Sequence, residues 1–310
     1  MMSKPSQTYH VPVLLKESVD GLNIKPGGIY VDVTFGGGGH SQEILNRLGQ
    51  EGRLYAFDQD ADAVQNKIND PRFTLIEGNF ANMKNYLRLE GVKEVDGILA
   101  DLGISSHQIN QPKRGFSTRY DEKLDMRMDK NADLTAYEVV NQYDEYDLRK
   151  IFSQYGDLKN AATLAKAIVK ARSEQPIRTT GELNEIVSKY FPKLKRNKFL
   201  AKLYQAIRIE VNGELEALKK MLQQAAMIIK PGGRLSVISY HSLEDRLVKR
   251  FIRDGLFEGQ PEKDFYGNIA VPFKKTGKLI IPSETEIAQN PRARSAKLRI
   301  AERTETSYQL

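Results

Sequence analysis

The chain has 310 residues, 40% of them hydrophobic, and a formal net charge of +7, which is enough for one large domain or two ordinary ones with a buried core. It contains no cysteine, which excludes disulfides, thiolate metal sites and cysteine nucleophiles. No apolar run approaches the ~20 residues that span a bilayer, and the first residues lack the apolar stretch of a secretory signal. We therefore expect a soluble, cytoplasmic protein with no membrane partner.

Short apolar segments alternate with helical patterns from residue 29 to about residue 103. The predicted strands are IYVDV, RLYAF, FTLIE and DGILAD, and the predicted helices between them are SQEILNRL, DADAVQNKI and NMKNYLRLE. This alternation is typical of a parallel sheet that is covered on both faces.

The pattern then changes to helices only, among them YDLRKIFSQYG, NAATLAKAIVKARS, TGELNEIVSKYF and RNKFLAKLYQAIRIEV. The alternation returns with the helix GELEALKKMLQQAAMIIK, the strand RLSVISY, the helix SLEDRLVKRFIRD and late strands near KLIIP and AKLRIAE. We predict one α/β domain, residues 1–110 and 213–310, interrupted by a mostly helical insertion at 111–212.

The insertion is also the basic part of the chain. Residues 149–210 carry fourteen Lys/Arg and five Asp/Glu, a net charge of +9, so the remainder is mildly acidic. Such a block is typical of a face that binds a polyanion. A solvated, lysine-rich helical surface explains the charge equally well.

Four consecutive glycines, 36–39, follow the first predicted strand and precede a helix. Glycine permits positive φ and lets a ligand approach the backbone, and a strand, glycine turn and helix form the plan of a nucleotide site. Asp58 ends the second strand, about where dinucleotide folds place a ribose-binding acid. Because Ser41 stands three residues after Gly38, the G-x-G-x-x-G spacing is absent, which disfavours a pyrophosphate ligand and an NAD-linked oxidoreductase.

Taken in order, VDVTFGGGG, AFDQD, EGNF, ADLG and KPGGRL resemble the Rossmann-like class I methyltransferases that use S-adenosyl-L-methionine. The segments YHVPVLLKE, GGGGHS, ADLGISSHQI, RGFS with LDMRMD, SYHSLEDR and NPRARSAKLR resemble the bacterial MraW family over nearly the whole chain. That family methylates N4 of a cytidine in the decoding centre of 16S rRNA. Where the family often has Gly-Pro before LDMRMD this chain has Glu122-Lys123, which affects the local loop.

The resemblance implies 16S rRNA in the small ribosomal subunit as the partner, a homodimer, and S-adenosyl-L-methionine as the cofactor. The implied cofactor contacts are Gly38, Gly39, His40, Asp58, Phe80, Asp101 and Gln108. Physical reasoning agrees for Asp58, which can accept both ribose hydroxyls, and for Asp101, which ends the fourth strand where α/β sheets bind ligands. His40 also fits an ordinary helix start, and Gln108 an ordinary loop residue.

Three residues are candidates for catalysis: Asp101, Tyr240 and His241. The N4 lone pair of cytosine is delocalised into the ring, so methyl transfer needs an acceptor for the amine hydrogen. Asp101 fits the role of that acceptor. The alternative is that Asp101 serves the cofactor alone, because DLGISS lacks the prolines and the aromatic residue that DNA amino-methyltransferases have at this place. Tyr240 is suited to stacking on a base, and His241 to hydrogen bonding or proton transfer. The structural alternative is that Ser242 caps the next helix, with Asp245 completing a near capping box.

The absence of cysteine excludes the covalent route to cytosine C5 methylation, and the four histidines lack metal-ligand spacing, so we expect no metal.

For RNA we expect contacts from the cluster Lys193, Lys195, Arg196 and Lys198 beside Phe191 and Phe199, from one strand face carrying Arg292, Arg294, Lys297 and Arg299, and from Arg114, Arg119 and Arg127. A DNA or small-molecule methyltransferase and a non-catalytic RNA-binding protein remain as alternatives.

Overall fold

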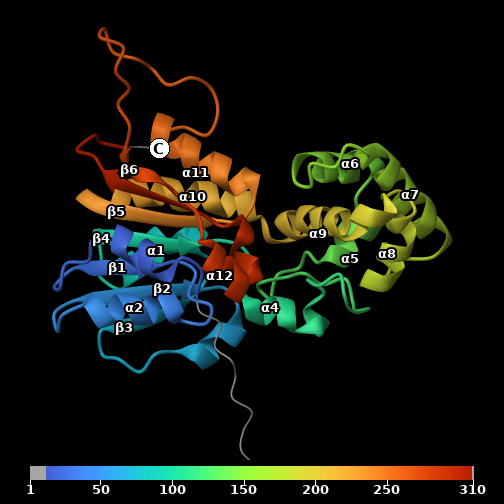
Figure 1. The fold of residues 1–310 in the computed structure, drawn as a ribbon, viewed down its shortest axis with the longest axis horizontal. Coiled ribbons are helices and arrows are strands. Elements are labelled where there is room, and N and C mark those ends of the chain that lie inside the picture. Colours follow the sequence, from blue (N-terminus) through green and yellow to red (C-terminus); the bar gives the residue numbers. More distant parts are fainter. Residues whose placement is uncertain (1–11, 309–310) are drawn as a thin grey trace, which may run out of the picture. The chain divides into compact units, whose positions relative to one another are not determined.

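A computed structural model describes residues 12–308 as two compact units (Figure 1). One consists of the described residues up to Gly103 and from Glu216 onward, and the other runs from Ile104 to Leu215. An α/β unit interrupted by a helical one confirms the predicted fold class. The motif YHVPVLLKE begins at Tyr9 and so lies partly outside the described residues. None of the helices within residues 12–308 is both long and apolar enough to cross a membrane.

The α/β unit is built on a seven-stranded sheet with the strand order β3-β2-β1-β4-β5-β7-β6. The strands are β1 (Ile29–Asp32), β2 (Arg53–Asp58), β3 (Phe73–Glu77), β4 (Val95–Asp101), β5 (Ile229–Ser239), β6 (Phe273–Ile280) and β7 (Lys297–Arg303). Strands β1 to β5 run parallel, whereas β7 pairs antiparallel with both β5 and β6. The strand order therefore reverses between β1 and β4.

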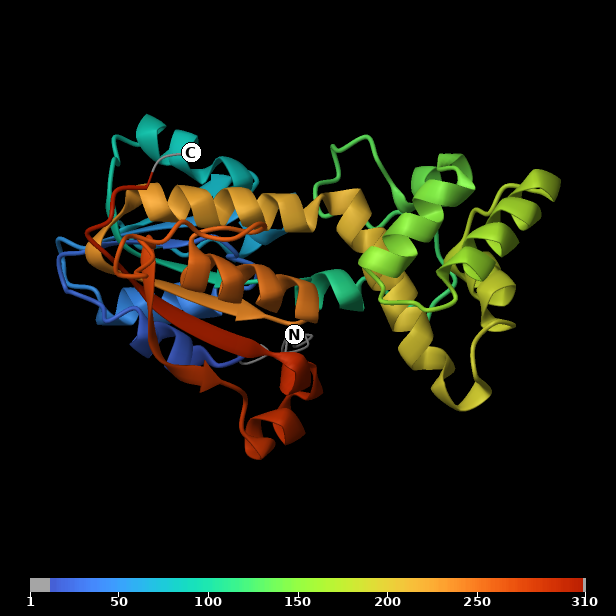
Figure 2. The same cartoon turned by 90° about the horizontal axis from the view of Figure 1, so that it is seen from above.

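Side chains along the parallel strands alternate between two buried faces. Tyr30 and Leu99 join an apolar cluster with α1 (Leu15–Gly21) and α2 (Gly39–Arg47), whereas their neighbours Val31 and Ile98 join a cluster on the other face. The helices of that second face are α3 (Met83–Leu89), α10 (Glu214–Ile228) and α11 (Ser242–Asp254). Figure 2 shows α10 and α11 in yellow-orange and orange on one face and the blue α1 and α2 on the other. Burial on both faces explains why these strands read as nearly continuous apolar runs.

The elements depart from prediction in a few places. The segment DADAVQNKI forms a short 3-10 helix, Ala61–Asn66, instead of an α-helix. The Asn66 side chain at its end donates a hydrogen bond of 3.0 Å to the Gly36 carbonyl. Helices α1 and α12 (Glu284–Gln289) are short and were not predicted. The last parallel strand, β5, includes the Lys-Pro-Gly-Gly turn, which lies where the pairing register with β4 shifts between Val95 and Gly97.

The helical unit packs around one apolar cluster that includes Leu148, Phe152, Leu164 and Leu203. Its α-helices are α4 (Ser106–Asn110), α5 (Ala136–Gln142), α6 (Glu145–Gln154), α7 (Ala161–Glu174), α8 (Thr180–Ser188) and α9 (Arg196–Asn212). Helix α8 begins at a reciprocal capping box formed by Thr179 and Glu182, which satisfies backbone N–H groups at its N-terminus. The four helices predicted from the sequence in this unit are confirmed.

Candidate active site

Four parallel strands deliver polar residues to one edge of the sheet. β1 ends at Asp32, β2 at Asp58 and β4 at Asp101, and Tyr240 directly follows β5. Because the strand order reverses between β1 and β4, this edge is the topological switch point at which open α/β sheets bind their ligands. The sheet thus brings the predicted residues of the α/β unit to a single place.

The glycine loop is fixed at this edge by its own backbone. Gly36 and Gly38 have φ angles of 50° and 77°, a region that side chains rarely adopt. The Gly38 N–H donates to the Phe35 carbonyl at 2.8 Å, which closes a tight turn ahead of α2. The Gly36 N–H donates to Asp58 Oδ2 at 2.8 Å, which ties the loop to the end of β2.

Two of the glycines differ sharply in the space around them. A Cβ atom added at Gly39 would lie 2.2 Å from Pro12 Cγ, whereas one at Gly37 would meet nothing within 4 Å. We expect Gly39→Ala to lower the free energy of unfolding by about 1–3 kcal/mol, because it overpacks this contact. Gly37→Ala, the matched control, should stay within about 0.5 kcal/mol of the parent. Urea unfolding measures both, and equal stability of the two variants would show that the Pro12 contact is not tight.

Asp58 is held by backbone N–H groups. Its Oδ2 accepts from Gly36, and its Oδ1 accepts from the Asp60 N–H at 2.8 Å. Burial raises the pKa of Asp58 to about 6, and the negative charges of Asp60 and Asp32 add to this effect. Each carboxylate oxygen keeps a further lone pair, so the Asp58 side chain can still accept the two hydrogens of a ribose diol.

Asp32 and Thr34 connect the strands beneath the loop. The fully buried Asp32 accepts from Ser41 Oγ at 2.7 Å and from the Thr34 N–H at 3.1 Å. Thr34 Oγ1 in turn accepts from the Asp101 N–H at 2.6 Å. Sequence reasoning missed Thr34 and Ser41; the one available signal was a threonine at the end of an apolar strand.

Asp101 lies between two ring side chains. The Tyr240 hydroxyl donates to Asp101 Oδ1 at 2.7 Å, and His40 Nδ1 lies 3.8 Å from Asp101 Oδ2. Burial raises the pKa of Asp101 to about 6; His40 and Tyr240 oppose that rise, while the charges of Asp32 and Glu244 increase it. Burial also raises the pKa of the Tyr240 phenol far above its usual value, so the phenol stays a donor. Asp101 and Tyr240 therefore form a hydrogen-bonded pair in which the phenol is the donor and the carboxylate the acceptor.

His241 caps α11, and the prediction that Ser242 does so is wrong. The Glu244 N–H donates to His241 Nδ1, and Glu244 Oε2 accepts from the N–H groups of Tyr240 and His241. His241 Nε2 lies 3.1 Å from Glu244 Oε1. Both nitrogens of the ring therefore face Glu244, and a catalytic role for His241 stays a prediction.

Phe80 and Gln108 lie in different units. Phe80 begins a 3-10 turn after β3, and its partly buried ring packs against the cluster of α3 and α10. Gln108 lies on α4 in the helical unit, where it forms a capping box with Ser105: the two residues exchange hydrogen bonds of 3.1 Å. The cofactor contacts assigned to both residues stay predictions.

Two of the arginines expected at an RNA edge hold the helical unit together. The buried Arg114 guanidinium donates to the carbonyls of Arg127 and Met128 at 2.8 and 3.0 Å. Arg127 forms two hydrogen bonds to the Asp125 carboxylate, at 2.8 and 2.9 Å. The prediction of an RNA contact is therefore wrong for Arg114, and the Arg127 guanidinium is already paired.

The predicted strand face near the C-terminus is also only partly right. Arg292 and Arg294 lie in a 3-10 helix, Pro291–Ser295, which begins at a proline and an Asn290 cap and so cannot continue a strand. Lys297 and Arg299 do lie on β7, but both contact Asp245 of α11, at 3.4 and 2.8 Å.

The basic tip of the helical unit consists of Lys189, Lys193, Lys195, Arg196 and Lys198. All five are exposed, and none forms an ion pair with the residues that the structure describes. Beneath them, Phe191 stacks on Phe199 with ring centroids 5.2 Å apart. Beside them lies an open hollow of about 400 Å³ lined by Asn184, Glu185, Ser188, Lys189 and Arg196.

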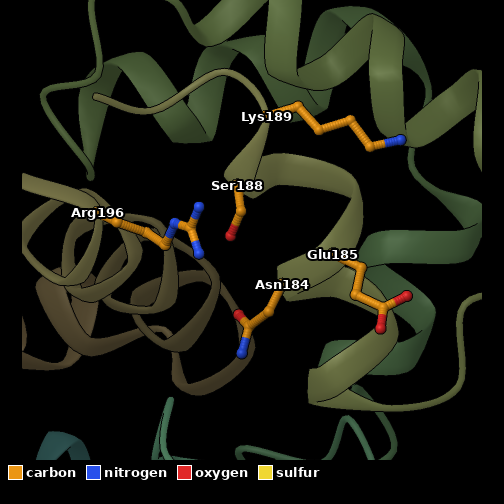
Figure 3. A pocket seen from close by; sticks show the side chains of 5 residues that line it. All are labelled: Asn184, Glu185, Ser188, Lys189 and Arg196. Atoms are coloured by element: carbon orange, nitrogen blue, oxygen red, sulfur yellow. The ribbon is translucent and has the colours of Figure 1, made fainter. Parts of the chain in front are cut away.

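The side chains around this hollow divide into two groups. In Figure 3, Arg196 extends toward Ser188 and Asn184, while the Lys189 ammonium and the Glu185 carboxylate lie on the other side. The Asn184 amide is held from behind, because its Oδ1 accepts from the Tyr204 hydroxyl at 3.0 Å. A guanidinium facing a hydroxyl is a suitable arrangement for an anion.

A doubly wound sheet with a glycine loop after β1, an acid ending β2 and a partly buried acid ending β4 is the arrangement of a class I methyltransferase. The model of the MraW methylase family matches residues 7–304, and the chain belongs to this family.

Curated relatives extend the match over almost the whole chain. Ribosomal RNA small subunit methyltransferase H of Flavobacterium johnsoniae is 65% identical over 95% of this chain and 98% of its own. The protein of the same name from Bacteroides thetaiotaomicron is 58% identical over 97% and 100%. Among solved structures, an rRNA methylase from Streptococcus thermophilus aligns with a TM-score of 0.41 at 14% identity, covering 96% of this chain and 99% of that one.

Proposed function

We propose that the protein transfers a methyl group from S-adenosyl-L-methionine to N4 of a cytidine in the decoding centre of 16S rRNA, in the small ribosomal subunit. Membership of a methylase family and relatives named for small-subunit ribosomal RNA support the reaction and the substrate class. The observation that supports an amine target is the partly buried Asp101 carboxylate at the switch point, oriented by the Tyr240 hydroxyl at 2.7 Å.

The charge of the site suits this cofactor. Burial raises the pKa of Asp32, Asp58 and Asp101 alike, so the ionised form of three carboxylates is disfavoured at one edge of the sheet. S-adenosyl-L-methionine carries a sulfonium and an ammonium cation, and a cation nearby favours the ionised form of each acid. When bound, the cofactor supplies an electrophilic methyl group. The glycine loop lets it approach the backbone, and Asp58 holds its ribose hydroxyls.

Replacing Asp58 should weaken cofactor binding. A hydrogen bond to a charged group contributes about 1.5–3 kcal/mol, so loss of the carboxylate in Asp58→Ala should raise the dissociation constant roughly ten- to hundredfold or more. Asp58→Asn keeps an oxygen that can accept from the Gly36 N–H, so this variant separates the loss of ribose binding from the loss of support for the loop. We expect its affinity for the cofactor to lie between those of the parent and Asp58→Ala. Calorimetric titration with the cofactor measures both, and unchanged affinity in Asp58→Ala would contradict the ribose role.

The residues of the chain provide the proton chemistry of the reaction. The amine nitrogen of cytosine becomes acidic as it gains a methyl group, and the Asp101 carboxylate accepts its hydrogen. Tyr240 is the residue that orients Asp101, because its phenol donates to Oδ1 and leaves Oδ2 available. A covalent adduct at C5 is excluded, since the chain has no cysteine.

The helical unit recognises the substrate. Its basic tip binds RNA phosphates. The five cations of the tip are exposed and have no partners among the described residues, so they are available to contact phosphates. Each such contact releases counterions from the RNA, and this release favours binding. In the adjoining hollow, Arg196 and Ser188 are placed to bind one phosphate group. A cytidine in folded RNA must also leave its stack to reach the Asp101 carboxylate.

The test of this function is methyl transfer from labelled S-adenosyl-L-methionine. Small ribosomal subunits from cells that lack this protein, deproteinised RNA from the same subunits and genomic DNA are offered as separate substrates. We expect label in RNA within the subunits. Label in DNA alone, or none in any substrate although the cofactor binds, would contradict the proposal.

A further inference from the structure

His40 is a buried residue to which the proposed reaction has so far given no part in proton transfer. The residue is only 5% exposed, and its ring lies between Val13 and Asp101. One ring nitrogen, Nε2, is 3.2 Å from the Val13 carbonyl oxygen, and the other, Nδ1, faces Asp101 Oδ2 at 3.8 Å. The imidazole therefore joins the first described residues of the chain to the reacting edge of the sheet.

The contact with Val13 fixes the position of a proton on the imidazole. A carbonyl oxygen only accepts hydrogen bonds, so Nε2 must carry the hydrogen, and in the neutral ring Nδ1 then presents a lone pair. The backbone enforces this geometry: Gly39 has no Cβ, and Pro12 occupies the space where one would lie, 2.2 Å away. The Pro12–Val13 segment is thereby held close to the start of α2, with the Val13 carbonyl on the His40 ring.

The other groups that act on the charge of Asp101 take part in hydrogen bonds of their own. They include Asp32 at the end of β1, Tyr240 after β5 and Glu244 on α11. Tyr240 is itself the donor to Asp101, and Asp32 already accepts from Ser41 and Thr34. Glu244 accepts two backbone N–H groups at the α11 cap. In neutral His40, by contrast, Nδ1 has a lone pair that points toward Asp101.

We propose that His40 accepts, through Asp101, the proton that the substrate amine releases; this inference rests on the proposed function. The amine N–H bond breaks with its electron pair staying on nitrogen, and an O–H bond forms on Asp101. The proton then passes from Oδ2 to His40 Nδ1, which restores the carboxylate and leaves an imidazolium whose Nε2–H stays on Val13. The present 3.8 Å separation is longer than a hydrogen bond, and catalytic contacts commonly tighten only when substrate is bound.

The decisive variant is His40→Gln, whose amide nitrogen reaches the place of Nε2. It keeps the hydrogen bond to Val13 but has no acceptor where Nδ1 stood. We expect kcat to fall roughly ten- to hundredfold, with little change in the KM for RNA. Full turnover in His40→Gln would overturn the proposal.

A second measurement does not depend on turnover. The chain has four histidines, so single substitutions assign every imidazole in a ¹⁵N spectrum. We expect His40 in the wild-type protein to carry its hydrogen on Nε2 and none on Nδ1. If the wild-type enzyme methylates RNA but His40 carries a hydrogen on Nδ1 throughout the pH range of activity, the proton relay is overturned and the proposed function stands. A wild-type protein that methylates no RNA would overturn the proposed function, and the relay with it.

Discussion

Asp101→Asn is expected to lower kcat by roughly two to four orders of magnitude, the usual contribution of a positioned general base. The amide keeps an oxygen that can accept from the Tyr240 hydroxyl, so the geometry of the pair is retained while the proton acceptor is lost. Single-turnover methylation of small subunits measures the effect. Because the pKa of Asp101 is raised to about 6, wild-type turnover should rise as the pH increases through 6, when the carboxylate becomes ionised.

The stability of the same variant is the control. A carboxyl group whose pKa is raised on folding binds more protons in the folded state, so its contribution to stability falls as the pH rises from about 4 to about 6. Above that range the partly desolvated charge of Asp101 lowers the stability of the folded protein, and asparagine carries no such charge. Asp101→Asn should therefore be at least as stable as the parent at pH 8 although it is nearly inactive. A variant that turns over normally would show that Asp101 serves only the cofactor.

Neutralising four cations of the basic tip is expected to reduce RNA affinity strongly. Replacing Lys193, Lys195, Arg196 and Lys198 by Gln removes four potential phosphate contacts, and each contact contributes about 0.7–0.9 to the slope of log affinity against log salt. The slope should become shallower by about 3 if all four touch phosphate. Filter binding of small-subunit RNA across a salt series measures both quantities.

A matched variant controls for net charge. Lys263, Lys274, Lys275 and Lys278 are equally exposed but belong to the α/β unit, so replacing them by Gln removes the same charge elsewhere. We expect this control to change the salt slope much less. If both variants lose the same affinity, binding depends on overall charge and the basic tip is not a specific contact surface.

The fold was largely predictable because its signals are local and periodic. Tyr30 and Val31, or Ile98 and Leu99, point to opposite faces, and both faces are buried, so short apolar runs separated by helical patterns indicate the parallel sheet. The acids Asp58 and Asp101 could be placed because each ends such a strand. The 3-10 helix at Ala61–Asn66 was not predictable in this way, since it depends on a side-chain contact with the glycine loop.

The details of the site depend on contacts between distant residues. Serine is a preferred N-cap, yet His241 takes that position because the Glu244 carboxylate reaches back to its backbone. Arg114 is buried against carbonyl groups that no spacing rule connects to it, and charged side chains are usually exposed. The contact of His40 with Val13 joins residues 27 positions apart. Such pairings become visible only when the chain is folded.

The most direct test of the proposed reaction is the identity and position of the methylated nucleoside. Small subunits from cells without this protein are incubated with the enzyme and S-adenosyl-L-methionine, and nuclease fragments of the RNA are analysed by mass spectrometry. We expect N4-methylcytidine in the fragment that contains the decoding centre, and far less of it in the same time when Asp101→Asn replaces the wild-type enzyme. A methyl group on another atom, another base or another region of the RNA would contradict the proposed reaction.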